Sequence, residues 1–331
     1  MSGRVVVVTG GSAGVGRATA EAFARRGDRV AVVARDRDRV EAAVGELERL
    51  GAPQAVGSVA DVADPAALEE AAETVERELG PIDVWVNNAM TAVLGKVRDT
   101  TAEDFRRVSD VTYLGSVHGY LAALTVMRPR DRGTIVQVGS ALAWRGIPLQ
   151  ASYCSAKHAI QGFYESLRTE LMHENSNIKL TIVHLPGLNT TQFGWVRLRG
   201  LHQHPQPVAP VFQPEVAAKA IVHAAKHPRR QLWVGLPTYY TIIGNWLAPA
   251  IQDRYLANTA FGGQQSDRSA APDRDDYLHT PVDDDTDRGS HGIFDDRAKN
   301  HSLALELTLR RGIIAAAIAS ASAAALAAAA R

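Results

Sequence analysis

Short runs of valine, isoleucine and leucine alternate with longer amphipathic segments over most of the chain. The apolar runs cover residues 5–8, 30–33, 84–86, 134–138, 180–185 and 232–234. The segments between them, such as residues 17–26, carry apolar positions at helical spacing. Continuous apolar strands between amphipathic helices are typical of a parallel sheet covered on both faces. Because such crossovers are right-handed, we predict an α/β fold with a doubly wound parallel sheet, a single domain over residues 1–257.

The pattern changes after residue 257. Residues 258–302 are crowded with Asp, Arg, Gly, Ser and Pro, and few apolar positions recur at a fixed period. This composition predicts an acidic extension that is poorly ordered or draped over the surface. Residues 303–331 are rich in alanine, and we predict a helical tail there.

The end of this tail is nearly apolar. Residues 313–330 follow Arg310 and Arg311, and their length is at the short end of the ~17–25 residues that span a bilayer. Leucine is scarce, and Ser320 and Ser322 interrupt the stretch. A membrane anchor, an interfacial or partner-binding helix and a frayed alanine-rich helix all stay open.

Composition narrows the classes of partner. Lys plus Arg and Asp plus Glu both number 36, so a basic footprint for nucleic acid is not expected. The single cysteine, Cys154, excludes an internal disulfide and a cysteine-built metal site. His202 and His204 have no third ligand nearby, so no metal is predicted. Without a signal-peptide pattern at the N-terminus, we expect a cytoplasmic protein, or a membrane-associated one if the tail anchors it.

A glycine-rich turn follows the first predicted strand and opens the first predicted helix. Glycines let backbone N–H groups approach a pyrophosphate, and the helix N-terminus adds positive potential. The residues expected to contact the phosphates are Gly10, Ser12, Ala13, Gly14, Val15 and Gly16.

The end of the second predicted strand indicates which dinucleotide would bind. A carboxylate at this place would bond the ribose 2′-hydroxyl of NAD(H), but the chain has Arg35. A guanidinium can bind a 2′-phosphate, with the Ser12 hydroxyl as a further donor. We therefore predict NADP(H), and Asp36, one position later, leaves NAD(H) as the second option.

Three residues form a candidate proton-transfer site. Lys157 follows Tyr153 by one helical turn, and Ser140 lies where the strand at residues 134–138 ends. A free tyrosine has a pKa near 10, and a nearby ammonium lowers the pKa by favouring the phenolate. A serine hydroxyl can hold the carbonyl or alkoxide oxygen beside the phenol. Carbonyl reduction or alcohol oxidation needs these groups.

Taken together, these motifs resemble the short-chain dehydrogenase/reductase family over about residues 4–257. The resemblance implies a Rossmann-type, nucleotide-binding oxidoreductase with Tyr153 as the general acid/base and Lys157 also on the nicotinamide ribose. It implies further cofactor contacts from Asp61, Val62, Asn88, Ala89, Pro186, Gly187, Thr190 and Thr191.

The sequence departs from the family pattern at two places. Met90 stands where the family has glycine, and Thr112 takes the place of a catalytic asparagine that holds a water next to the lysine. A threonine hydroxyl bonds water with a shorter reach than an amide, so we retain Thr112 as a catalytic candidate with an altered relay. The departures also leave open a dinucleotide-binding sensor or scaffold with little turnover, beside a membrane-tethered lipid or steroid reductase.

The substrate side is less clearly marked. Residues 192–214 are placed to form a lid, and Trp195, Trp144 and Met90 suggest an apolar pocket for an alcohol or carbonyl on a hydrophobic body. The family resemblance also implies a homodimer or homotetramer that pairs through the helices carrying Thr112 and Tyr153.

Overall fold

The computed structural model describes residues 3–271, 274–282 and 287–311. Its centre is a seven-stranded sheet with the strand order β10-β7-β6-β4-β1-β2-β3, and all neighbouring strands are parallel. The strands are β1 Val5–Thr9, β2 Arg29–Ala34, β3 Ala55–Val59, β4 Ile82–Asn87, β6 Thr134–Ser140, β7 Lys179–Leu185 and β10 Gln231–Trp233. The predicted doubly wound parallel sheet is confirmed.

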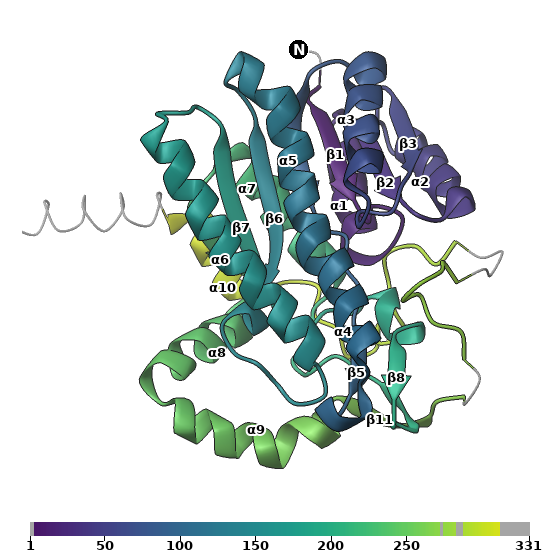
Figure 1. Cartoon of the computed structure of the whole chain (residues 1–331), viewed down its shortest axis with the longest axis vertical. Coiled ribbons are helices and arrows are strands. Elements are labelled where there is room, and N and C mark those ends of the chain that lie inside the picture. Colours follow the sequence, from purple (N-terminus) through teal and green to yellow (C-terminus); the bar gives the residue numbers. More distant parts are fainter. Residues whose placement is uncertain (1–2, 272–273, 283–286, 312–331) are drawn as a thin grey trace, which may run out of the picture.

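Helices cover both faces of the sheet, as Figure 1 shows. One face packs against α1 Gly14–Ala24, α2 Arg37–Arg49 and α7 Pro214–Lys226. The other packs against α3 Pro65–Leu79, α5 Gly115–Met127 and α6 Ala151–His173. Successive side chains of a strand point to opposite faces, so Val6 and Val8 enter the first layer and Val5 and Val7 the second. A strand buried on both sides must be apolar throughout, as the sequence pattern requires.

Besides this sheet and its two helical layers, the chain forms further helices, turns and two small pairs of strands. The helices are α4 Ala102–Val108, a π-helix at Ser109–Leu114, α8 Gly235–Leu247, α9 Pro249–Gly263 and α10 Leu303–Leu309, with short 3-10 turns η1 Val97–Asp99, η3 Arg128–Arg130, η4 Ala141–Ala143 and η5 Thr191–Gly194. Two small pairs of strands join β5 Val93–Gly95 to β8 Arg197–Arg199, and β9 Gln203–Pro205 to β11 Gln265–Ser269. In Figure 1, α8 and α9 form a hairpin that extends below the sheet.

The C-terminal extension differs from its prediction. The expected domain boundary at residue 257 falls inside α9, which continues to Gly263. Beyond it, Leu278 and Phe294 of the predicted extension are buried, and so is Leu305 of the predicted tail. Leu278 packs among Val93, Val108 and Ala156 of the main domain. The extension therefore runs over the main domain and inserts the Leu278 side chain into its core.

The alanine-rich tail lies mostly outside the described residues. Helix α10 begins at Leu303, where the helical tail was predicted, and residues 313–330 are not described. Among the described residues, no helix is both long and apolar enough to cross a membrane.

The glycine turn after β1 lies where the strand order of the sheet reverses. The chain runs from β1 to β2 and β3 on one side, and from β4 to β6, β7 and β10 on the other. Gly10 and Gly14 have φ values of +64° and +55°, which disfavour any residue with a Cβ atom. At Gly16 a Cβ would lie 2.1 Å from the Gly10 carbonyl oxygen. Ligands bind at such reversal points in open α/β sheets.

A methyl group at Gly16 should break this turn. We expect Gly16→Ala to lower the free energy of unfolding by about 1–3 kcal/mol, since the added Cβ overlaps backbone atoms. Gly45→Ala is the matched control, because no atom lies within 4 Å of a Cβ on that helical glycine, and it should stabilise the protein by about 0.5–1 kcal/mol. Urea unfolding measures both variants, and equal stability of Gly16→Ala and wild type would contradict the packing of the turn.

Candidate active site

A cavity of about 620 Å³ lies along the carboxyl edge of the sheet and runs from the glycine turn to Tyr153. Its volume is in the range of about 300–1,000 Å³ that is usual for ligand pockets. The structure brings together in its lining most of the site residues predicted from the sequence: Gly10, Ser12, Ala13, Gly14, Val15, Arg35, Asp61, Val62, Asn88, Ala89, Ser140, Tyr153, Lys157, Pro186, Gly187, Thr190 and Thr191. Gly16 and Thr112 lie outside this lining.

The ends of β1 and β4 are tied together beside the glycine turn. The Asn88 amide donates to the carbonyl oxygens of Thr9 at 3.0 Å and Gly10 at 3.2 Å. The Thr9 hydroxyl accepts hydrogen bonds from the backbone of Asn88 and of Ala89. Asn88 therefore fixes the shape of the turn with its side chain, and Ala89 presents a small side chain to the cavity.

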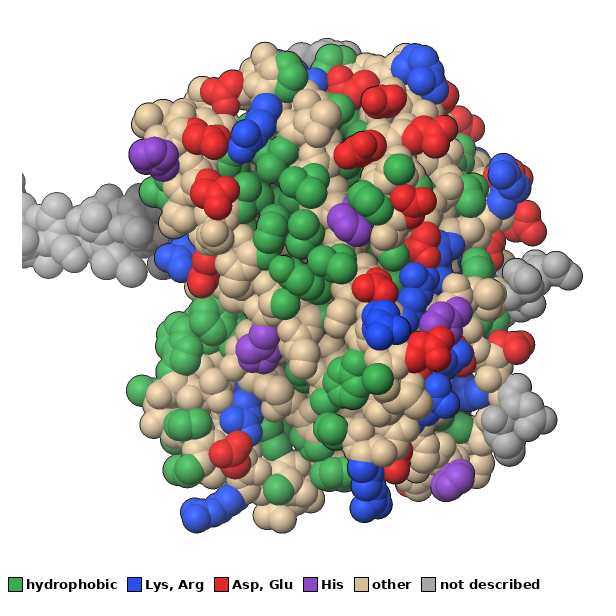
Figure 2. Space-filling view, viewed as in Figure 1, with side chains coloured by type: hydrophobic (Ala, Val, Ile, Leu, Met, Phe, Trp, Pro, Cys, Tyr) green, Lys and Arg blue, Asp and Glu red, His purple; other side chains and the backbone are tan. Residues whose placement is uncertain are grey.

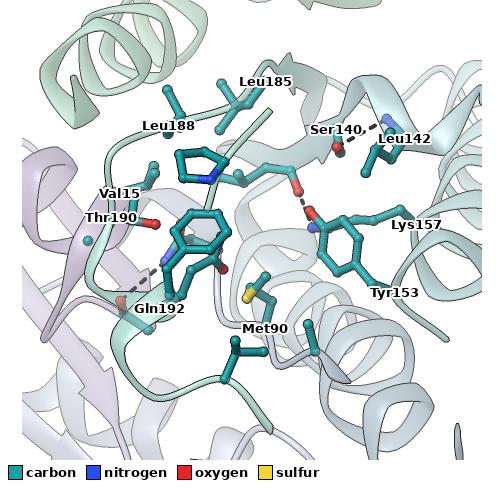
Figure 3. Close-up of a pocket in the computed structure, with 18 of the residues that line it drawn as sticks. Val15, Met90, Ser140, Leu142, Tyr153, Lys157, Leu185, Leu188, Thr190 and Gln192 are labelled. Atoms are coloured by element: carbon teal, nitrogen blue, oxygen red, sulfur yellow. Dashed lines mark hydrogen bonds between the residues drawn. The ribbon is translucent and has the colours of Figure 1, made fainter. Parts of the chain in front are cut away.

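Tyr153, Lys157 and Ser140 lie close together at the other end of the cavity (Figure 3). Tyr153 and Lys157 project from the first turns of α6, and Ser140 is the last residue of β6. The Lys157 ammonium donates to the Val138 carbonyl oxygen at 2.9 Å and lies 5.6 Å from the centroid of the Tyr153 ring. The Ser140 hydroxyl oxygen accepts a hydrogen bond from the Leu142 amide at 3.1 Å. The expected juxtaposition of the three groups is present.

The pKa values of this group follow from its burial. Burial raises the pKa of the Tyr153 phenol, and the hydrogen bond with Ser140 opposes that rise. Burial also lowers the pKa of Lys157 to about 8. Burial is the largest influence on the Tyr153 pKa and raises it, so the expected lowering by the ammonium is not seen in this structure, where Lys157 donates to Val138. Tyr153 is therefore a protonated phenol at neutral pH.

His184 on β7 supports this arrangement, and sequence reasoning missed it. One imidazole nitrogen, Nδ1, is 3.0 Å from the Ser140 carbonyl oxygen, and the other accepts from the Trp144 indole at 3.3 Å. Burial lowers the pKa of His184 to about 4, so the ring is neutral and Nδ1 carries the proton donated to Ser140. A histidine in the apolar run at residues 180–185 was the only signal in the sequence.

The catalytic role predicted for Thr112 does not agree with its contacts. Its side chain is fully buried, and the hydroxyl donates to the Thr91 carbonyl at 2.8 Å and accepts from the Thr91 amide at 2.9 Å. A hydroxyl has one proton to donate, and here the backbone takes it. Thr112 thus holds the π-helix against the segment after β4. These contacts do not support a role in a proton relay.

At the glycine-turn end, Arg35 and Asp61 face the same part of the cavity. The Arg35 guanidinium lies 3.9 Å from the Asp61 carboxylate, which also bonds Arg107. Burial alone would raise the pKa of Asp61, but the hydrogen bonds from Arg107 and the Ala63 amide, together with the charges of Arg107 and Arg35, lower it below its ordinary value. Asp36, the residue that kept NAD(H) open, caps α2 by accepting from the Arg39 amide at 3.0 Å. Its carboxylate therefore has a structural partner.

The cavity lining includes Met90 and Trp195, two of the three residues predicted for the substrate side, and residues 192, 193, 196 and 207–209 of the predicted lid. The Trp195 ring lies between the guanidinium groups of Arg39 and Arg288, each 4.9 Å away, at the Arg35 end of the cavity. The Trp144 ring packs against His184 and is not part of the lining. Near Tyr153 the wall comes from α8 and α9: Pro237, Tyr240, Thr241, Gln252, Tyr255 and Leu256.

Within the described residues, no group of three or more His, Cys, Asp or Glu side chains could hold a metal ion. The cavity instead offers backbone donors, arginines and a phenol, which suit an anionic organic ligand.

The sequence matches a family model and is similar to known proteins over most of its length. The family model for short chain dehydrogenases matches residues 4–197. An uncharacterized oxidoreductase, YxnA, from Bacillus subtilis (strain 168) is 32% identical over 278 residues, which cover 83% of this chain and 78% of that protein. The 3-dehydrosphinganine reductase of Danio rerio is 33% identical over 197 residues, covering 58% of this chain and 59% of that protein.

Solved structures share the fold. A short-chain dehydrogenase from Streptomyces avermitilis superposes with a TM-score of 0.66 at 25% identity, over 79% of this chain and 98% of that one. An alcohol dehydrogenase from the archaeon Thermococcus sibiricus, complexed with 5-hydroxy-NADP, gives a TM-score of 0.60 at 26% identity, over 70% of this chain and 95% of that one. Both neighbours are matched almost entirely, so the unmatched part of this chain is an addition to their common fold.

The buried ammonium should make stability depend on pH. The pKa of Lys157 is about 8 in the folded state, against an ordinary value of 10.5, so the side chain is charged in both states below pH 8 and loses its proton first in the folded state. Stability therefore rises between pH 8 and pH 10.5, by about 3 kcal/mol for this group. Methionine has no charge to bury. We therefore expect the free energy of unfolding of Lys157→Met minus that of wild type to be larger at pH 7 than at pH 10.

Urea unfolding at the two pH values measures this difference, with Lys226→Met, at an exposed position on α7, as the control. A Lys157→Met difference that is the same at both pH values would contradict the burial of a charged ammonium.

Proposed function

Because the chain belongs to the short-chain dehydrogenase/reductase family of oxidoreductases, we propose that it interconverts a carbonyl and an alcohol on a hydrophobic substrate with NADP(H), with Tyr153 as general acid/base. The observation that carries this proposal is one continuous cavity lined by the glycine turn at one end and by Ser140, Tyr153 and Lys157 at the other. In a nicotinamide dinucleotide the pyrophosphate joins the adenosine to the nicotinamide riboside, so the glycine turn would hold the pyrophosphate, and Ser140, Tyr153 and Lys157 would lie at the nicotinamide.

The residues present fit a dinucleotide. Gly10 and Gly14 have positive φ values and line the cavity at the start of α1, so the backbone of the turn can approach phosphate groups there. Thr190 and Thr191 lie against Gly14 and add hydroxyls at the same place. A bound nicotinamide dinucleotide would supply the hydride that is added to the carbonyl carbon.

Tyr153 would supply the proton. Its phenol is protonated at neutral pH because burial raises its pKa, and reduction of a carbonyl needs a donor in this state. Donation leaves a phenolate, which the charged Lys157 nearby stabilises. Since Lys157 has a pKa of about 8, it carries this charge at neutral pH. These charge states favour carbonyl reduction over alcohol oxidation near pH 7.

Ser140 would hold the substrate oxygen. Its hydroxyl bonds the Tyr153 phenol and its backbone carbonyl lies at the His184 ring, so the side chain is fixed at the end of β6. A carbonyl oxygen placed between Ser140 and Tyr153 would have one donor to position it and one to protonate it. His184 acts through Ser140 and does not reach the substrate.

The preference for NADP(H) is supported by the ribose end of the cavity. Arg35 offers a guanidinium there, while the Asp36 carboxylate is engaged in capping α2. The Thermococcus sibiricus alcohol dehydrogenase with 5-hydroxy-NADP is a neighbour that binds a phosphorylated dinucleotide, in agreement with this choice.

The substrate proposed is hydrophobic. Next to Tyr153 the cavity is walled by the hairpin of α8 and α9, whose outer side chains are apolar and exposed, including Trp246 at 56%, Leu247 at 80% and Ile251 at 68%. Tyr240 and Tyr255 face both the cavity and solvent. This wall suits an apolar body entering beside the hairpin.

We also propose self-association through α5 and α6, as in the family. Figure 2 shows apolar side chains gathered over these helices. Leu121 of α5 is 51% exposed and Met172 of α6 is 65% exposed. An apolar patch over neighbouring helices is typical of a protein interface.

Removing the phenolic hydroxyl should abolish turnover and preserve binding. We expect Tyr153→Phe to lower kcat/KM for NADPH-dependent reduction of an accepted ketone by about 10²–10⁴-fold, the usual contribution of a general acid, with the Kd for NADPH nearly unchanged. Tyr120→Phe is the control, because that buried hydroxyl has no hydrogen-bond partner among the described residues. NADPH absorbance with a panel of ketones and aldehydes measures the rates. Binding of NADPH by wild type without oxidation across the panel would favour a dinucleotide sensor.

The ribose end can be tested separately. We expect Arg35→Ser to raise the Kd for NADPH by about 10–100-fold, since a charge-assisted hydrogen bond is lost, and to change the Kd for NADH little. Arg37→Ser, at an exposed neighbouring position, should alter neither. Calorimetric titration gives the constants, and equal weakening of both dinucleotides by Arg35→Ser would exclude a 2′-phosphate contact.

A further inference from the structure

Part of the C-terminal extension lies directly over the Arg35 end of the cavity. We call residues 274–282 the strap. Tyr277, Pro281 and Val282 of the strap line the cavity together with Arg35 and Asp61. In Figure 1 this region of the chain passes beside β8, far in sequence from the glycine turn that it approaches. The strap leaves the cavity open beneath it, so it forms a wall and does not fill the site.

Three arginines of the main domain hold the strap by its backbone. Arg35 donates to the carbonyl oxygens of His279, at 2.9 Å, and of Tyr277. Arg107 donates to the Leu278 carbonyl at 2.9 Å, and Arg39 donates to the Val282 carbonyl. These bonds use main-chain acceptors, which any strap sequence with the same path would present.

Side chains of the strap fix it in place. Leu278 is fully buried in a cluster with Val93, Val108 and Ala156. The Tyr277 amide donates to the Trp195 carbonyl at 3.1 Å, and the two rings lie 6.0 Å apart. The Asp276 carboxylate accepts from Arg197 at 2.8 Å. The strap is thus anchored on both sides of the residues that meet Arg35.

We propose that the strap is part of the dinucleotide site: it walls the adenosine end and holds Arg35 in position for the 2′-phosphate of NADP(H). This proposal rests on the proposed function. Arg35 has five N–H donors in a planar fork, so two bonds to strap carbonyls orient the group and leave donors for a phosphate. Holding a long side chain in advance spares the entropy lost when it is ordered on binding. The extension then contributes to both affinity and the choice between NADPH and NADH.

Displacing the strap in the full-length protein tests this proposal. Leu278→Glu places a carboxylate in the apolar cluster, and Leu307→Glu on α10, at a leucine 60% exposed, is the matched control. We expect Leu278→Glu to raise the Kd for NADPH by about tenfold, the effect of one ordered side chain, and the Kd for NADH by less. Leu307→Glu should leave both constants unchanged. Calorimetry gives the constants, and hydrogen–deuterium exchange over residues 274–282 reports release of the strap.

Leu278→Ala serves if the glutamate variant does not fold, and it should shift the constants in the same direction by a smaller factor. A released strap with unchanged or tighter NADPH binding, or with equal loss for both dinucleotides, would overturn the proposal. Such a result would leave the proposed function standing as long as wild type binds NADPH. Failure of wild type to bind either dinucleotide would overturn both.

Discussion

The site depends on the contact between the carboxyl ends of β1 and β4, where the strand order of the sheet reverses. The Asn88 amide bonds the carbonyls of Thr9 and Gly10, and glycine at position 16 lets α1 start against the same atoms. This contact fixes one end of a cavity of about 620 Å³. Because β6 pairs in register with β4, it also sets where Ser140, the last residue of β6, meets the other end.

Burial then determines the chemistry available at that other end. Tyr153 and Lys157 are removed from water, which raises the pKa of the phenol and lowers that of the ammonium to about 8. Both shifts have the same physical origin, since low polarity penalises the charged form. Near neutral pH they leave a neutral proton donor next to a positive charge, a pair suited to protonating an oxygen on which negative charge develops.

The fold could be predicted because strands buried on both faces must be apolar throughout, as in residues 5–8 and 30–33. Strand β3 escaped detection because Gly57 and Ser58 interrupt its apolar run. The predicted site residues mostly meet in one cavity. The hydroxyl of Thr112, in contrast, is taken by a backbone segment whose path the sequence does not reveal. The strap was missed for a related reason, since its bonds to arginine come from carbonyl oxygens that every residue carries.

We propose that hydride and proton are added across a carbonyl in this cavity. Incubation of wild-type protein with a ketone panel and NADPH deuterated at the transferable C4 position, followed by mass spectrometry of the products, tests this chemistry. We expect an alcohol with a single deuterium on the carbinol carbon. Bound NADPH with no labelled alcohol from any substrate in the panel would contradict it.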